Sequence, residues 1–154
     1  MNSKIEWQVD DQGSLIKPVV HDGTIFEFSL LSDFKILRFS VRPEAGGIIP
    51  QEARISHLEF SRISQINVVE LWNCPILSGI SIWRVNAVPE RCWDGPNSGW
   101  RLLFQNQISA VDKAKEQAAR TIRSQPSSYL VEVGSSYGGS IALVCESIDV
   151  YQES

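Results

Sequence analysis

The sequence has few of the residues from which catalytic and metal sites are usually built. It contains two histidines and three cysteines in 154 residues. Cys74, Cys92 and Cys145 are odd in number, lie far apart and form no CxxC pair, so neither a disulfide framework nor a zinc site is indicated. Such a set of cysteines suits a reducing compartment best. On this basis we expect no metal and no cofactor.

Long apolar runs are also missing. Charged side chains from Lys4 to Lys17 interrupt the apolar stretch that a signal peptide needs. No later apolar run reaches the length of a membrane span. We therefore expect a cytoplasmic protein with no membrane partner.

The charge is only mildly unbalanced. Fourteen Lys and Arg residues against eighteen Asp and Glu residues give a net charge of −4. This acidity disfavours attraction to a phosphate backbone, so no nucleic-acid partner is expected. With 43% hydrophobic and 21% charged residues, the composition is that of a globular protein. We expect a single domain over residues 1–154.

The sequence is rich in alternating apolar positions. They recur in four places, at Phe26–Leu30, Leu37–Val41, Ile80–Ile82 and Ala142–Val144. A period of two puts each set on one face of a strand. Because a single helix-like stretch interrupts the pattern, we predict an α+β fold, a curved and mostly antiparallel sheet of about six to nine strands with one amphipathic helix near the C-terminus.

Turn-forming residues divide the alternating pattern into individual strands. Ser32-Asp33 supplies a turn between two strands of a hairpin. Between Phe60 and Ile63 the apolar phase slips by an odd number of residues, which is typical of a bulge or a tight turn. The predicted strands are 23–31, 34–42, 53–71 (as one strand or two), 76–88, 100–105, 129–133 and 140–151, with a further edge strand around Ile5, Trp7 and Val9.

The helix is predicted near residues 109–124. Apolar residues recur there at intervals of three to four, including Val111, Ala118 and Ile122. Ser109 suits the N-cap, and Pro126 ends the helix at about Ser124. Its opposite face is polar, so one side should pack on the sheet.

Several residues have chemistry to offer, but each also has a structural interpretation. His21 and Asp22 are the types that serve as a base and its orienting carboxylate, yet with no nucleophile beside them they are interpreted as a turn. His57 lies in antiphase with buried positions, which predicts a surface or edge residue. Arg91 beside Cys92 favours a thiolate, but an inert cysteine remains the simpler interpretation. The glycines of 134–139 precede a strand and lack the Lys-Ser/Thr ending of a phosphate loop, which indicates a hairpin turn.

Tryptophans gather in the middle of the sequence. Trp72 and Trp83 lie in strand-like segments and are predicted to be core residues. Trp93 lies instead in a polar loop, residues 90–99, and a tryptophan on a loop is typical of a binding anchor. The predicted partner-binding residues are Glu90, Arg91, Trp93, Asp94 and Trp100. The alternative is that Trp93 folds back and caps the core.

Two segments carry a resemblance to known proteins. They are His-Asp-Gly-Thr-Ile-Phe-Glu-Phe at 21–28 and Ser-Tyr-Gly-Gly-Ser-Ile-Ala-Leu-Val-Cys at 136–145. Both resemble the opening and closing patterns of small bacterial proteins of uncharacterised families, some of which are immunity proteins of polymorphic toxins. The resemblance covers only these stretches and implies a cytosolic, non-enzymatic protein that binds another protein.

Two function hypotheses therefore stand side by side. In the first, the chain is a binding module, an immunity protein in the specific case, that neutralises a toxin by steric and electrostatic blockade. In the second, it is a small-ligand-binding protein or an enzyme with a pocket between sheet and helix, using His21, Asp22 or Cys92. Self-association into a homo-oligomer stays open in both.

Overall fold

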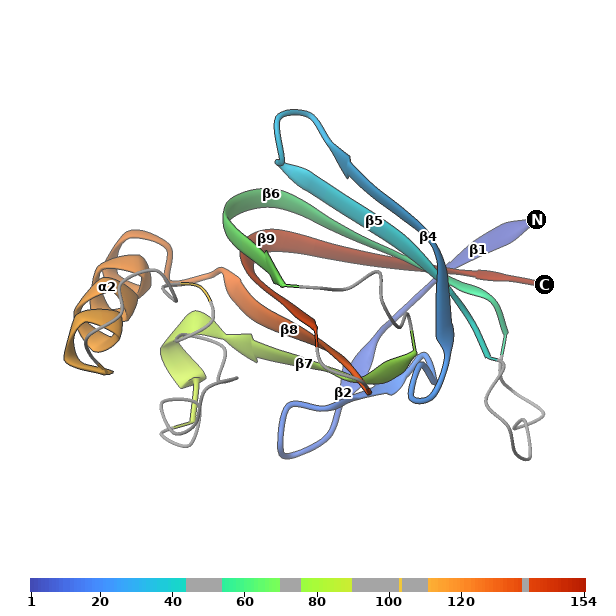
Figure 1. Ribbon diagram of the computed structural model, residues 1–154, viewed down its shortest axis with the longest axis horizontal. Helices are drawn as coiled ribbons and strands as arrows, with labels where there is room; N and C mark the ends of the chain where they lie inside the picture. The colour runs from blue at the N-terminus through green and yellow to red at the C-terminus, as the bar shows by residue number, and fades with distance from the viewer. Residues whose placement is uncertain (44–53, 70–75, 90–102, 104–110, 137–138) are drawn as a thin grey trace.

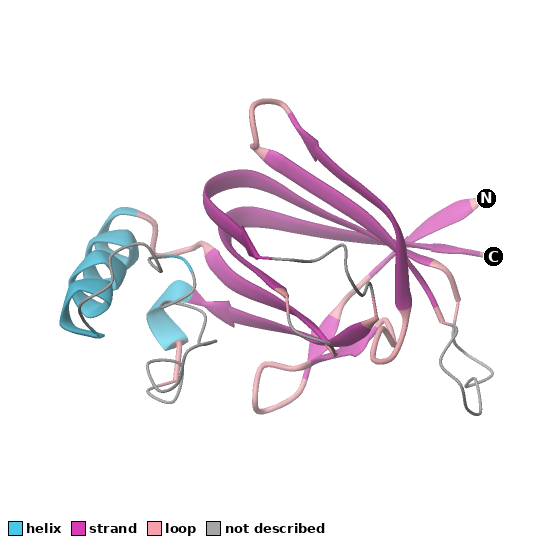
Figure 2. Cartoon of the chain, in the orientation of Figure 1, coloured by secondary structure: helices cyan, strands magenta, loops and turns pink. Residues whose placement is uncertain are grey.

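Antiparallel strands make up most of the protein in the computed structural model (Figures 1 and 2). The structure describes residues 1–43, 54–69, 76–89, 103, 111–136 and 139–154. The strands are β1 (Asn2–Ile5), β2 (Gln8–Val9), β3 (Leu15–Lys17), β4 (Thr24–Leu31), β5 (Ile36–Arg42), β6 (Ser56–Val69), β7 (Leu77–Arg84), β8 (Tyr129–Ser135) and β9 (Ser140–Glu153). A 3-10 helix, η2 (Val85–Ala87), and an α-helix, α2 (Val111–Ser124), complete the described elements.

Seven of the strands form one curled sheet. Its order is β4-β5-β6-β9-β8-β7, with β1 added along β9. The two ends of this order meet, because Thr24 at the start of β4 bridges to Ile76 just before β7. The backbone N–H of Asp22 also donates to the carbonyl of Leu77 at 2.8 Å. The small β2–β3 hairpin lies against β7 through a bridge between Ser14 and Ser81.

The long strands β6 and β9 run side by side through the whole sheet. Their pairing extends from Ser56 opposite Gln152 to Val69 opposite Ser140, with a register shift between Ile63 and Gln65. At this bulge Arg62 has a left-handed backbone, φ 53°. Ile63 and its partner Cys145 are both buried in the main core, so the two strands change phase together after Phe60 and the slipped apolar phase remains buried.

The inner face of the curl holds the main core. Phe39 and Phe60 stack there, with 5.7 Å between ring centroids. Leu58, Val131 and Leu143 are among the buried residues packed around them. These residues come from alternating positions of neighbouring strands, so their side chains line the same face of the sheet.

The helix α2 covers part of the outer face. Ala118 of α2 packs with Val85, Leu130 and Val144 in a second buried cluster. A polar contact fixes the same helix to β6, since Gln65 Nε2 donates to Thr121 Oγ1 at 3.0 Å. In the described part of the chain, no helix has the length and apolarity to cross a membrane.

Most of the predicted elements are confirmed. The fold class, the β4–β5 hairpin, the bulged strand at 56–69, the terminal hairpin and the helix all lie where the pattern placed them. The predicted strand 76–88 was too long, because the chain turns into η2 at Val85 and buries this residue under α2. The predicted strand 100–105 was wrong at its one described residue, Leu103, which is helical.

The structure requires a glycine at position 13. Its φ is +79°, and an added Cβ would lie 2.2 Å from Nε1 of Trp83. The carbonyl of Gly13 also accepts a hydrogen bond from the Ile82 N–H at 2.8 Å, so the turn is held close to β7. The β2–β3 hairpin therefore depends on a residue with no side chain here.

We predict that Gly13→Ala lowers the free energy of unfolding by about 2–4 kcal/mol, from left-handed strain plus overpacking against Trp83. Gly79→Ala is the matched control, because nothing lies within 4 Å of its added Cβ. It should change the free energy by less than about 0.5 kcal/mol. Denaturant unfolding of both variants makes the measurement, and equal costs would contradict the close approach.

Candidate functional site: the open outer face

The outer face of β4, β5, β6 and β9 is open to solvent where α2 does not cover the sheet. Cross-strand pairing places Glu27 opposite Ser40, Ser40 opposite His57, and His57 opposite Tyr151. The next row places Ser29, Arg38 and Glu59 side by side in the same way. Polar side chains from distant parts of the sequence thus form two parallel rows on one rigid surface.

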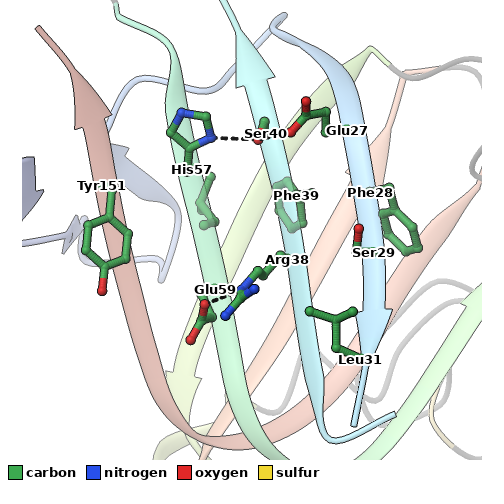
Figure 3. Close-up of a pocket in the computed structure, with 11 residues that line it drawn as sticks. Glu27, Phe28, Ser29, Leu31, Arg38, Phe39, Ser40, His57, Glu59 and Tyr151 are labelled. Atoms are coloured by element: carbon green, nitrogen blue, oxygen red, sulfur yellow. Dashed lines mark hydrogen bonds and ion pairs between the residues drawn. The ribbon is translucent and has the colours of Figure 1, made fainter. Parts of the chain in front are cut away.

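A pocket lies along these rows (Figure 3). It encloses about 350 Å³. Leu31 forms its apolar rim on β4 and is 37% exposed. Phe28 also borders the pocket, but it pairs with Phe39 and so lies on the other face of β4 from Glu27 and Ser29. The lining residues are Glu27, Phe28, Ser29, Leu31, Arg38, Phe39, Ser40, His57, Leu58, Glu59 and Tyr151.

Three polar side chains form a continuous hydrogen-bonded chain across the sheet. Ser40 Oγ lies 2.7 Å from His57 Nδ1, and His57 Nε2 lies 3.0 Å from Glu153 Oε1. With the ring proton assigned to Nε2, the imidazole donates to Glu153 and accepts the Ser40 hydroxyl hydrogen. Ser40 is only 5% exposed, so this bond satisfies a buried hydroxyl.

The residue types in this chain are those of a serine nucleophile, a base and an orienting carboxylate. Acyl transfer also needs N–H donors aimed at the developing oxyanion. Ser40 sits on β5, whose two edges are paired with β4 and β6, so its neighbouring N–H groups are committed to these ladders. The arrangement therefore suits a structural hydrogen-bond network between strands better than a catalytic nucleophile.

Two ion pairs also lie on this face. Arg38 Nε bonds Glu59 Oε2 inside the pocket. Lys4 Nζ lies 2.6 Å from Asp149 Oδ1, and this hydrogen bond raises the pKa of Lys4. Glu27 is different, because its contact in the described residues is a long one, 3.5 Å from Ser40 Oγ to Oε2.

The turn between β4 and β5 has an unusual backbone. Ser32, Asp33 and Phe34 are consecutive non-glycine residues with φ of 52°, 55° and 66°. Left-handed geometry costs roughly 1–2 kcal/mol per residue, and a bulky aromatic there is a genuine outlier. Phe34 is 64% exposed at the tip, so no burial of its ring offsets this strain.

Hydrogen bonds hold this turn in place. The Lys35 N–H donates to the carbonyls of Leu31 and Ser32, both at 3.1 Å, and the Lys35 carbonyl accepts from Ile63 N–H at 3.0 Å. The hydrogen bond from Ile63 connects the end of the hairpin to the bulge of β6. The tip projects past β6 at the top of Figure 1.

The predicted site residues are not brought together by the described part of the chain. The loop with Glu90, Arg91, Trp93 and Asp94, together with Trp100, lies outside the described residues, as does Cys92. His21 and Asp22 do contact each other, with 2.9 Å between Nδ1 and Oδ2, but both are exposed in a turn before β4. Asp22 has φ 60°, so the backbone is not extended and the turn interpretation holds.

One sequence signal was passed over. Residues 134–138 read Gly-Ser-Ser-Tyr-Gly, the spacing of a nucleophile elbow. A nucleophile elbow joins a strand to a helix, whereas this connector joins the antiparallel strands β8 and β9. The hairpin interpretation of the segment is therefore confirmed, although residues 137 and 138 lie outside the described range.

The sequence also gave no direct sign of the Ser40–His57–Glu153 chain. These residues are far apart in the sequence, and only the strand register makes them neighbours. The only signal in the sequence was the alternation of apolar positions, which predicted that His57 faces outward. Its neighbours on the outer face can be identified only once the strand register is known. His57 is half-buried on the outer face, as expected.

Comparison of the chain with protein-family models, curated proteins and solved structures finds no match. Across the described residues, no group of three or more His, Cys, Asp or Glu side chains has the arrangement of a metal site. Any functional assignment therefore rests on the geometry of the outer face and of the β4–β5 tip.

We predict a favourable coupling of about 1 kcal/mol between Ser40 and His57 in a double-mutant cycle of Ser40→Ala and His57→Ala. The reason is that each single variant leaves a polar partner unpaired in a partly buried site. Denaturant unfolding of the four proteins supplies the energies. Strictly additive effects would show that the hydrogen bond contributes nothing to stability.

We also predict that Cys145 resists alkylation in the folded protein. Burial raises the pKa of its thiol to about 12, so almost no thiolate forms at pH 8. Peptide mapping after iodoacetamide treatment should find Cys145 unmodified under native conditions and modified in denaturant. Rapid native modification would contradict the packing of β9.

Proposed function

We propose that the chain is a non-enzymatic protein-binding module. Its recognition surface comprises the β4–β5 tip and the open outer face beside it. In the specific form that the sequence resemblance suggests, it is a bacterial immunity protein that blocks a toxin in the cytoplasm. The predicted loop at 90–99 would add a second contact region.

The observation that carries this proposal is the displayed aromatic ring at the tip. Phe34 is held in a strained backbone and is largely exposed, and the exposed Phe28 and Leu31 lie on the same hairpin. Strain that the fold does not need is a pointer to function. Exposed aromatic anchors on a rigid support are typical of interface hot spots.

The electrostatics support the same proposal. The chain carries a net charge of −4, and the adjoining pocket has two carboxylates, Glu27 and Glu59, against one guanidinium. Acidic surfaces attract basic partners and increase the association rate. A basic toxin domain fits this balance.

The small-ligand hypothesis is kept as the second candidate because of the pocket. That pocket lies on β4, β5, β6 and β9, however, and not between the sheet and α2 as this hypothesis expected. Neither His21 nor Asp22 lines it, and Cys92 lies outside the described residues.

The test uses the product of the adjacent gene as the candidate partner. We predict that Phe34→Ala weakens its binding by about 2 kcal/mol or more, as expected for a hot spot. Calorimetric titration gives the affinity. Ile16→Ala is the control, since Ile16 is 51% exposed but lies on β3, away from the tip.

Stability measurements show whether the Phe34 ring is exposed for binding or contributes to packing. Phe34→Gly should raise the free energy of unfolding by about 0.5–1 kcal/mol, because glycine relieves the left-handed strain. Phe34→Ala retains a Cβ and should stay within about 0.5 kcal/mol of the parent. If both variants are destabilised and binding is unchanged, the ring is a packing element and the proposal is wrong.

A further inference from the structure

We infer that the pocket on the outer face binds the guanidinium group of an arginine side chain. This inference rests on the proposed function, since it names the chemistry of the partner at the surface beside the tip. The pairing of the charges, the size of the pocket and its rim all support an arginine side chain.

The hydrogen bonds of Ser40 leave the Glu27 carboxylate able to accept N–H groups from a ligand. A serine hydroxyl has one hydrogen, and Ser40 uses it on His57 at 2.7 Å in the assigned tautomer. Among the described residues, Glu27 Oε2 then keeps only the long contact with Ser40 Oγ, at 3.5 Å. The carboxylate is exposed and has two oxygens that can accept two parallel N–H bonds.

The neighbouring positive group does not compensate this charge. Arg38 lines the same pocket but is engaged by Glu59, which lies opposite it on β6. Figure 3 shows the Arg38–Glu59 pair one row away from Glu27 and Ser40. Among the described residues, Glu27 is thus the carboxylate of the pocket that lacks a cation.

The shape of the pocket suits one long side chain. Its volume of about 350 Å³ is near the lower end of the range for small-molecule sites, roughly 300–1,000 Å³. Leu31 at the rim offers apolar surface to the methylene stem.

An arginine is favoured over a lysine by geometry. The guanidinium is planar and matches a carboxylate with two N–H bonds, whereas an ammonium acts as a point charge. Ser29 on the same strand adds a hydroxyl acceptor within the pocket lining. An uncharged isostere such as citrulline keeps the shape and loses the attraction to Glu27.

The test uses N-acetyl-arginine amide as the probe and N-acetyl-citrulline amide as its matched control. Backbone amide NMR should show saturating shifts at residues 27–29 and 38–40 with the arginine compound, in the millimolar range, and no saturation with citrulline. Glu27→Gln should weaken arginine binding about fivefold or more. Glu6→Gln removes the same charge from an exposed site outside the pocket and should leave it unchanged.

Several outcomes would overturn the inference. They are equal binding of citrulline, no saturation with arginine, saturating shifts elsewhere on the sheet, or an unchanged affinity in a folded Glu27→Gln variant. The two proposals can also be separated. If the protein binds the arginine compound but Phe34→Ala leaves partner binding unchanged, the pocket inference stands and the tip proposal is wrong. If Phe34→Ala weakens partner binding but the arginine compound does not bind, the tip proposal stands and the pocket inference is wrong.

Discussion

The pairing of β6 with β9 is the interaction on which the rest of the structure depends. The two strands have 14 residues each and lie together along nearly their full length. β5 adds to the far edge of β6, whereas β8 and β1 share the far edge of β9. Each end of the pair therefore has a different neighbour, which is why one end of the outer face is covered by α2 and the other is open.

The open end is polar for a physical reason. An outer row that no helix covers must remain hydrated, so alternate positions there carry Arg38, Ser40, His57 and Glu59 instead of apolar residues. At the covered end the corresponding row holds Leu130 and Val144, together with Gln65, whose amide is bonded to the helix. A single pair of strands thus carries both a second core and a binding face.

Much of the fold was predictable because it depends on local periodicity. Alternation identified the β4–β5 hairpin and the slipped phase near Ile63, and the change of period identified the helix. The start of η2 at Val85 was not predictable, since its burial comes from the tertiary contact with α2. The candidate site depends on register between distant strands, so only the outward direction of His57 was accessible from the sequence.

The bulge in β6 connects the core to the proposed recognition tip. Ile63 at this bulge lies on the inner face, and its N–H donates to the carbonyl of Lys35. The hairpin end is therefore fixed by a residue whose side chain is buried in the main core. A strained turn attached in this way cannot relax without disturbing the core, so the ring of Phe34 remains displayed beside the pocket that contains Glu27.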